Sequence, residues 1–286
     1  MATVIDIIKK SERYLCECGI ANSRLEAELL LCHAINAERL DLYVNFNRHL
    51  DVQESLRINN LLERRGNREP LQYIIGTQEF WGLRFKVTED VFIPRPETEL
   101  LVESTVEIYS RLSRARTQFT ILDLCTGSGC IAVALAIEIP DAQIYAIDNS
   151  YTSLKIAIEN ARLHGVNNRI QFICGNIFEL LIRDRVDLII SNPPYISTNS
   201  ISGLQPEVKD YEPFRALNGG ADGLDFIRSI IIEAESILSK GNCLILEIDY
   251  CQGDIIRNFI NRDIWDMEIK RDYAGIERIA ILTLKR

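Results

Sequence analysis

Residues 119–130 read FTILDLCTGSGC and carry the clearest indication of the fold. The apolar run at 119–124 predicts a buried strand, and the run at 129–137 predicts a helix. Between them lies a turn that contains Gly127 and Gly129. Glycines in this position let the backbone approach a ligand closely at the N-terminus of the helix. The stretch therefore predicts a ligand-binding loop at the carboxyl end of a parallel strand.

The remainder of the C-terminal half continues this alternation of strand and helix patterns. Further strands are predicted at 143–147, 170–174, 186–190, 243–248, 267–270 and 279–284, and further helices at 152–163, 226–238 and 253–259. Alternation of this kind is typical of a parallel sheet with helices on both faces. We expect an α/β fold with a Rossmann-like, mostly parallel, seven-stranded sheet.

The strand at 186–190 leads into Asn192-Pro193-Pro194-Tyr195. Ligands of open α/β sheets bind at the carboxyl ends of strands. The Pro193 carbonyl and the Asn192 side-chain oxygen offer two hydrogen-bond acceptors, which suit a planar –NH2 group. Tyr195 adds a ring face for a flat substrate. The tetrad predicts a site for an amide or an exocyclic amine, and an ordinary turn is the alternative.

Two other strand ends carry groups that suit a nucleoside. Asp148 follows the strand at 143–147, where a carboxylate can accept both hydroxyls of a ribose; the alternative is a helix cap before Tyr151. Asn176 and Ile177 follow the strand at 170–174. The Asn176 oxygen can accept from an adenine amine, and Ile177 can cover one adenine face.

The glycine loop departs from the dinucleotide fingerprint G-x-G-x-x-G, which needs glycine at 125, 127 and 130, where this sequence has Cys, Gly and Cys. A nicotinamide cofactor is therefore disfavoured. The spacing resembles the acidic-x-G-x-G-x-G loop of class I S-adenosylmethionine (SAM) methyltransferases, with Cys125 in place of the first glycine. That replacement requires that position 125 not need a positive φ.

Composition narrows the class of protein. The 286 residues are 47% hydrophobic and 26% charged, as in globular proteins, and the net charge of -9 argues against a protein that coats a polyanion. The eight cysteines form no C-x-x-C pair and there are three histidines, so we expect no metal site. Reduced cysteines indicate the cytoplasm, and no apolar run approaches the ~20 residues that span a membrane.

The N-terminal part differs from the rest. Apolar residues recur at helical spacing, so residues 1–70 predict a helical bundle, either a docking module for a macromolecular substrate or a stabilising appendage. Residues 71–93 contain aromatic and β-branched runs at 72–75, 79–83 and 84–87, which predict a β-hairpin connector. The third part, 94–286, begins near Arg95 and Glu97, which can face the edge of the sheet.

Several segments resemble the HemK/PrmC family, the peptide chain release factor glutamine methyltransferases. They are SRLEAELLL (23–31), PLQYIIGTQEFWGLRFKVTEDVFIPRPETELLVE (70–103), DLCTGSGCIA (123–132), NPPYI (192–196), YEPFRAL (211–217), GGADGLDFIR (219–228), LEIDYCQG (246–253) and RDYAGIERIA (271–280). The resemblance covers nearly the whole chain and implies a class I SAM-dependent methyltransferase with an N-terminal helical domain.

The resemblance also implies the reaction: methyl transfer from SAM to the side-chain amide nitrogen of the glutamine in the Gly-Gly-Gln motif of class 1 release factors. The implied cofactor residues are Asp123, Cys125, Thr126, Gly127, Ser128, Gly129, Asp148, Asn176, Ile177 and Asn192. The implied substrate residues are Asn192, Pro193, Pro194, Tyr195 and Glu212, with Asn192, Pro193 and Tyr195 as the catalytic set. We add Arg95 and Glu97 as secondary substrate candidates because of their place near the edge of the sheet. We expect Arg95 to pair with the Glu212 carboxylate, the helical domain to hold the release factor, and the enzyme to be a monomer.

Two alternatives stay open. A DNA or RNA amino-methyltransferase uses the same tetrad on an exocyclic base amine, but the acidic chain lacks a basic recognition domain after the sheet. A non-catalytic SAM-binding module is the second alternative, and the intact tetrad beside the glycine loop disfavours it.

Overall fold

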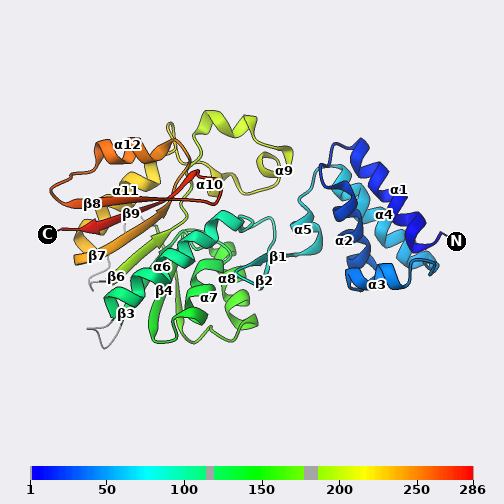
Figure 1. Cartoon of the computed structure of the whole chain (residues 1–286), viewed down its shortest axis with the longest axis horizontal. Coiled ribbons are helices and arrows are strands. Elements are labelled where there is room, and N and C mark those ends of the chain that lie inside the picture. Colours follow the sequence, from blue (N-terminus) through cyan, green and yellow to red (C-terminus); the bar gives the residue numbers. More distant parts are fainter. Residues whose placement is uncertain (1, 114–118, 177–185, 286) are drawn as a thin grey trace. The chain divides into compact units, whose positions relative to one another are not determined.

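The computed structural model describes residues 2–113, 119–176 and 186–285. The chain forms two compact units (Figure 1). Unit 1 comprises Met1–Thr77 and Gln205–Tyr211, and unit 2 comprises Gln78–Leu204 and Glu212–Arg286. A short piece of the C-terminal half thus belongs to the N-terminal unit, which the sequence patterns do not indicate.

Unit 1 is the helical bundle that the sequence predicts. Its helices are α1 (Val4–Glu17), α2 (Ser23–Ile35), α3 (Arg39–Val44), α4 (Val52–Gly66), α5 (Leu71–Ile75) and α9 (Pro206–Lys209). The apolar faces of α1, α2 and α4 pack together around Leu15, Leu30 and Ile58, which are fully buried. Helix α4 begins at a capping box, in which Asp51 accepts from the Glu54 N–H at 2.7 Å.

The segment 205–211 is fastened to this bundle by charged side chains. Glu207 accepts from Arg65 at 3.0 Å and from Arg68 at 2.7 Å. The Tyr211 hydroxyl donates to the Asn67 carbonyl at 2.6 Å. The Arg65 side chain is only 6% exposed, so removal of Glu207 would leave a buried charge without one of its partners, which is costly.

The connector differs from its prediction at the start. Residues 71–75 form helix α5, which ends at Gly76 in the left-handed conformation (φ 82°). The hairpin consists of β1 (Thr77–Phe80) and β2 (Leu83–Lys86), with positive φ at Trp81 and Gly82 in the turn. The strand predicted at 72–75 is wrong, because a short apolar run does not distinguish one helical turn from a strand.

Unit 2 contains the predicted seven-stranded sheet, in the order β5-β4-β3-β6-β7-β9-β8. The strands are β3 (Phe119–Leu124), β4 (Ala142–Asp148), β5 (Ile170–Cys174), β6 (Val186–Ser191), β7 (Leu238–Glu247), β8 (Trp265–Arg271) and β9 (Glu277–Leu284). Strands β3 to β7 are parallel, and β9 runs antiparallel to both β7 and β8. Because the chain order reverses between β3 and β6, the carboxyl ends of these strands form the switch point where such sheets bind ligands.

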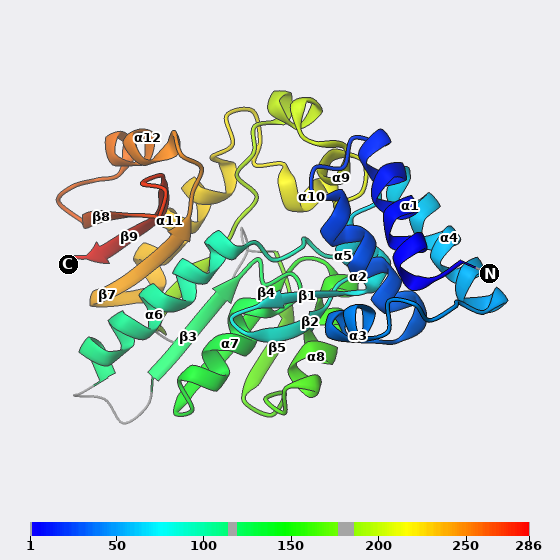
Figure 2. The ribbon, with the colours of Figure 1, turned by 45° about the vertical axis from the view of Figure 1, so that its right-hand side comes forward.

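Helices cover both faces of the sheet (Figure 2). One face packs against α6 (Glu99–Leu112), α7 (Cys130–Glu138) and α8 (Tyr151–Leu163), and the other against α11 (Asp225–Ile237) and α12 (Gln252–Phe259). Consecutive strand residues enter opposite cores, as Ile121 and Leu122 do, so the strands are apolar throughout. Short helices η1 (Pro96–Thr98), η4 (Thr198–Gly203) and α10 (Phe214–Leu217) adjoin the carboxyl edge. Within the described ranges, no helix has the length and apolarity that crossing a bilayer requires.

Candidate active site

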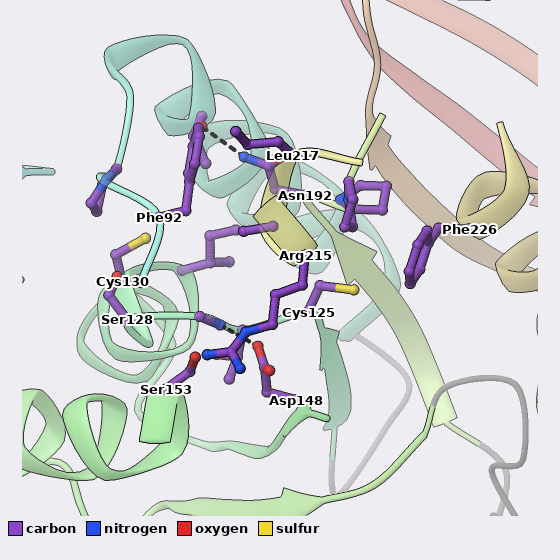
Figure 3. A pocket seen from close by; sticks show the side chains of 18 of the residues that line it. Phe92, Cys125, Ser128, Cys130, Asp148, Ser153, Asn192, Arg215, Leu217 and Phe226 are labelled. Carbon is purple, nitrogen blue, oxygen red and sulfur yellow. Dashed lines mark hydrogen bonds between the residues drawn. The ribbon is translucent and has the colours of Figure 1, made fainter. Parts of the chain in front are cut away.

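A cavity lies at the switch point, within unit 2 (Figure 3). Its walls combine the glycine loop after β3, Asp148 at the end of β4, and the tetrad after β6. The segments around Phe92 and Arg215 complete it. The two groups of residues that the sequence singles out, one suited to a nucleoside and one to an –NH2 group, therefore face one shared space.

The glycine loop has an unusual backbone. Gly127 and Gly129 have φ of 56° and 78°, and Cys125 has φ of 61°. The expectation that position 125 avoids a positive φ is wrong. A side chain in this conformation costs about 1–2 kcal/mol, and the loop holds it there through bonds such as that from the Thr126 N–H to the Ile147 carbonyl at 3.0 Å.

Gly129 has a second reason to be glycine. It caps the N-terminus of α7, and a Cβ atom there would lie 2.9 Å from the Ala157 Cβ atom of α8. At Gly127, by contrast, the nearest atom to such a Cβ would be the Cys125 carbonyl oxygen at 3.9 Å. Gly129 therefore serves packing, whereas a side chain at Gly127 would make only an ordinary contact with the protein, and Gly127 lines the cavity.

Asp148 joins the loop to the next strand. Its Oδ2 atom accepts from the Gly127 N–H at 2.9 Å, and its Oδ1 atom accepts from the Ser150 N–H at 2.8 Å. Each carboxylate oxygen retains a further lone pair. Burial raises the pKa of Asp148, while the backbone N–H donors and the nearby Arg215 oppose that rise. Figure 3 shows the Arg215 side chain reaching toward Asp148.

Asp123 lies behind the glycine loop rather than on the cavity wall. It is 0% exposed, and its Oδ2 atom accepts from the Thr126 hydroxyl at 2.6 Å. The Oδ1 atom has no fully formed hydrogen bond among the described residues. Burial raises the pKa of Asp123 to about 7. In this arrangement the carboxylate braces the loop from beneath.

We call the tetrad Asn192, Pro193, Pro194 and Tyr195 the acceptor wall. The Asn192 Nδ2 atom donates to Thr98 Oγ1 at 3.1 Å, drawn as a dashed line in Figure 3. The Tyr195 hydroxyl donates to Glu247 Oε1 at 3.1 Å. Across residues 2–113, 119–176 and 186–285, no hydrogen bond reaches Asn192 Oδ1 or the Pro193 carbonyl oxygen. Both acceptors thus stay available at the cavity.

A tight turn supports the backbone of this wall. A Cβ atom at Gly219 would lie 2.7 Å from the Pro194 carbonyl oxygen, and one at Gly223 would lie 2.3 Å from the Tyr195 carbonyl oxygen. Gln252 Nε2 donates to that Tyr195 carbonyl at 2.9 Å. Only glycine permits these approaches, so the segment GGADG fixes the tetrad from behind.

The expected pairing of Arg95 with Glu212 is confirmed by an ion pair between Arg95 Nη2 and Glu212 Oε1. The Glu212 carboxylate is buried, and burial raises its pKa while Arg95 opposes the rise. Arg95 also lies 4.5 Å from the centre of the Phe92 ring. Among the described residues, neither this pair nor the exposed Glu97 lines the cavity. Their contact with substrate stays a prediction.

Two further residues, Asn176 and Ile177, were predicted to contact the adenine. Asn176 is exposed and is not part of the cavity wall formed by the described residues, and Ile177 lies outside the described residues. Sequence reasoning missed lining residues such as Phe92, Ser153, Arg215, Leu217 and Phe226. Arg215 and Leu217 belong to the YEPFRAL segment, so that segment carried a usable signal.

Comparison with known proteins identifies the family. The PrmC N-terminal domain family matches residues 6–76, and the methyltransferase small domain family matches residues 98–204. A release factor glutamine methyltransferase of Geobacter sulfurreducens is 43% identical over 278 residues, which cover 97% of this chain and 95% of the relative. The chain belongs to the release factor glutamine methyltransferase family. Another member, from Thermodesulfovibrio yellowstonii, is 42% identical over 258 residues, covering 90% of this chain and 91% of that protein.

This methyltransferase also shares its fold with solved structures of lower identity. A human methyltransferase 10 domain containing protein matches with a TM-score of 0.52 at 15% identity, covering 72% of this chain and 91% of that one. A ribosomal protein L11 methylase of Lactobacillus delbrueckii subsp. bulgaricus matches with a TM-score of 0.50 at 20% identity, covering 73% and 90%. At these identities the matches support the methyltransferase fold and nothing finer.

Proposed function

We propose that the enzyme transfers a methyl group from SAM to the side-chain amide nitrogen of the glutamine in the Gly-Gly-Gln motif of class 1 release factors. The observation that carries the proposal is the pair of available acceptors, Asn192 Oδ1 and the Pro193 carbonyl, on the same cavity as the glycine loop. The family to which the chain belongs supplies the substrate.

The cofactor side fits a nucleoside. Gly127 lines the cavity without a side chain, which allows a ligand to lie against the loop, and Asp148 has lone pairs left for two ribose hydroxyls after binding Gly127 and Ser150. When bound, SAM supplies a methyl group activated by a positively charged sulfur. The residues of the chain hold it in place, with Asp123 keeping the loop in its bent form through Thr126.

The substrate side of the site has to position an amide nitrogen, which is a weak nucleophile. The lone pair of an amide nitrogen is delocalised into its carbonyl group. Asn192 Oδ1 and the Pro193 carbonyl would each accept one N–H of the glutamine, which fixes the plane of the amide and the direction of its nitrogen. Tyr195 would pack beside it. Positioning of this kind supplies most of the rate when the electrophile is strong. Proton loss can follow transfer, and we assign no dedicated base.

We assign the binding of the release factor to the N-terminal helical domain, residues 1–70, and place the enzyme in the cytoplasm as a monomer. The match of residues 6–76 to the PrmC N-terminal domain supports the first assignment. All eight cysteines are free, which fits a reducing compartment.

The test is incubation with labelled SAM and a purified class 1 release factor, followed by mass mapping of the product. We expect one added methyl group on the glutamine of the Gly-Gly-Gln motif. A release factor whose motif glutamine is replaced by alanine is the control and should take up none. Methylation at another residue, or transfer to DNA or RNA instead, would refute the proposal.

A further inference from the structure

We propose that Asn160 is a positioning residue for the cofactor. Its side chain ties the Ser128 carbonyl of the glycine loop to the backbone of Lys86. It thereby fixes the glycine loop relative to the segment 90–94, which forms another part of the cavity wall. The inference deepens the proposed function and rests on it in one respect, that SAM binds against the glycine loop.

Asn160 lies on α8 and is 0% exposed. Its Oδ1 atom accepts from the Lys86 N–H at 2.7 Å. Its Nδ2 atom donates to the Lys86 carbonyl at 3.0 Å and to the Ser128 carbonyl at 2.8 Å. Because a backbone N–H only donates and a backbone carbonyl only accepts, these partners leave the amide group a single orientation. The side chain therefore holds both segments in one arrangement.

The two partners of Asn160 belong to different parts of the site. Ser128 lies between two glycines of positive φ, is 2% exposed and lines the cavity. Lys86 is the last residue of β2 and is not part of the cavity wall formed by the described residues. The chain reaches that wall shortly afterwards, at Asp90. Asn160 thus connects the glycine loop directly with the segment that leads into another wall of the cavity.

Helix α8 holds this segment at two further points. The Ser153 hydroxyl donates to the Asp90 carbonyl at 2.9 Å, and the His164 ring, at the end of the helix, bonds the Arg84 carbonyl at 2.8 Å. These two positions recur at helical spacing with Asn160, so one side of the helix faces the segment. Asn160 also bonds the glycine loop. Its loss should therefore free the loop while the two outer bonds still hold the segment.

The bond to Ser128 supports the half of the loop that the carboxylates do not hold. Asp123 bonds Thr126 and Asp148 bonds Gly127, both before Ser128 in the chain. A loop freed at Ser128 can adopt several conformations, only one of which fits the ligand. The apparent affinity then falls by the fraction of molecules in that conformation. We therefore expect the loss of Asn160 to weaken SAM binding and to leave the transfer step intact.

Asn160→Asp tests the inference with almost no change in size. The new side chain still accepts from the Lys86 N–H, but it places an oxygen against the carbonyls of Lys86 and Ser128. We expect the SAM dissociation constant, measured by calorimetry on the folded variant, to rise about 10- to 100-fold, the usual effect of an opposed buried polar group. KM for SAM should rise with it, whereas kcat at saturating SAM and KM for the release factor should change little. Asn160→Ala, which removes all three bonds, should behave alike.

His164→Phe is the matched control. It removes the bond to the Arg84 carbonyl and keeps a ring beside Phe85, whose centre lies 5.2 Å from that of the His164 ring. This variant loosens the same segment without touching the loop, so it should bind SAM as the wild type does. A purely structural role of Asn160 would lower the free energy of unfolding of all three variants and leave SAM binding by the folded protein unchanged. That result would overturn the inference, and so would an equal rise of the dissociation constant in His164→Phe.

A measurement on the wild type does not depend on how the variants fold. Hydrogen exchange of the Lys86 N–H reports the opening of its bond to Asn160. S-adenosylhomocysteine at about 100 times its dissociation constant should slow this exchange by up to about 100-fold, because the opening also disturbs the loop that binds the ligand. The Trp81 N–H, which bonds the Glu99 carboxylate at 2.7 Å in the same hairpin, is the control and should slow much less.

Equal slowing at Lys86 and Trp81, or no slowing at Lys86, would contradict the inference. Cofactor binding and amide exchange need no methyl acceptor, so both readouts are separate from the proposed reaction. A wild type that binds SAM and methylates no release factor would contradict the proposed function alone.

Discussion

Two buried carboxylates stand behind the two halves of the site, Asp123 behind the glycine loop and Glu247 behind the acceptor wall. Both have a pKa raised to about 7 by burial, and each keeps one oxygen without a full hydrogen bond among the described residues. They differ in what they hold. Asp123 bonds Thr126, three residues away in the same loop, whereas Glu247 bonds Tyr195, 52 residues away.

That difference separates a site made by backbone from a site made by side chains. The glycine loop is shaped by local φ values and by backbone N–H groups that bond Asp148. The acceptor wall depends on hydrogen bonds among side chains from separate segments. We therefore expect changes in the loop to act on SAM binding and changes in the wall to act on methyl transfer.

The largest effect expected is that of Asn192→Ala. Loss of the positioning acceptor should reduce methyl transfer about 1,000-fold, in line with the removal of one fixed polar group from an active site. The SAM dissociation constant, measured by calorimetry, should change little. Asn199→Ala, at an exposed position in η4, is the control and should behave as wild type. Full activity in Asn192→Ala would remove the tetrad from the mechanism.

The two carboxylates should resemble each other in how stability depends on pH. Because burial raises the pKa of each in the folded state, their stabilising contribution is complete below the ordinary pKa near 4 and is lost as pH rises through about 7. For Glu247 the loss amounts to roughly 3 kcal/mol at most. Denaturant unfolding at pH 5 and pH 8 should show this fall in the free energy of unfolding for the wild type.

Denaturant unfolding of two variants distinguishes the contributions of Asp123 and Glu247. Glu247→Gln and Asp123→Asn should each remove part of the fall between pH 5 and pH 8. Only Asp123→Asn should also weaken SAM binding, since Asp123 braces the loop. A wild type equally stable at both pH values would show that these carboxylates are not shifted as described.

Asp148→Ala should have a smaller effect, on the cofactor side alone. The substitution removes the acceptor of the Gly127 and Ser150 N–H groups and of the ribose hydroxyls. We expect SAM to bind about 30-fold more weakly, or about 2 kcal/mol. Asp141→Ala serves as the control, because Asp141 is exposed and immediately precedes β4, at the end of the strand opposite Asp148. An unchanged SAM dissociation constant would count against the ribose assignment.

The smallest effect concerns Cys125. Because its φ is 61°, Cys125→Gly should relieve backbone strain and raise the free energy of unfolding by up to about 1 kcal/mol. Cys125→Ala keeps a Cβ atom and the strain, so it should not be stabilising. Thermal unfolding of the two variants distinguishes them, and equal stability would show that the left-handed backbone costs nothing here.

The sequence was sufficient for features that depend on local patterns. The periodicity at 143–147 and 186–190 predicted strands that the structure contains, and the glycine loop and tetrad were recognisable from adjacent residues. Prediction from the sequence failed where residues far apart in the chain determine the local structure. The φ at Cys125 follows from bonds to the neighbouring strand β4, through the carbonyl of Ile147. The hydrogen bonds from Asn192 to Thr98 and from Tyr195 to Glu247 likewise join residues that are 94 and 52 positions apart.

The grouping of residues 205–211 with the helical unit could not be predicted from the sequence either. It depends on ion pairs from Glu207 to Arg65 and Arg68, and single charged residues far apart in a sequence carry no pattern that pairs them. The helix at 71–75 was missed for the opposite reason, because its local pattern fits two structures.

The most direct test of the account is a structure of the enzyme with S-adenosylhomocysteine and a peptide that carries the Gly-Gly-Gln motif. The account predicts the nucleoside against residues 125–129, with its ribose on Asp148. It also predicts the glutamine nitrogen within hydrogen-bond distance of both Asn192 Oδ1 and the Pro193 carbonyl. A nucleoside bound elsewhere, or an Asn192 side chain turned away from the glutamine, would contradict it.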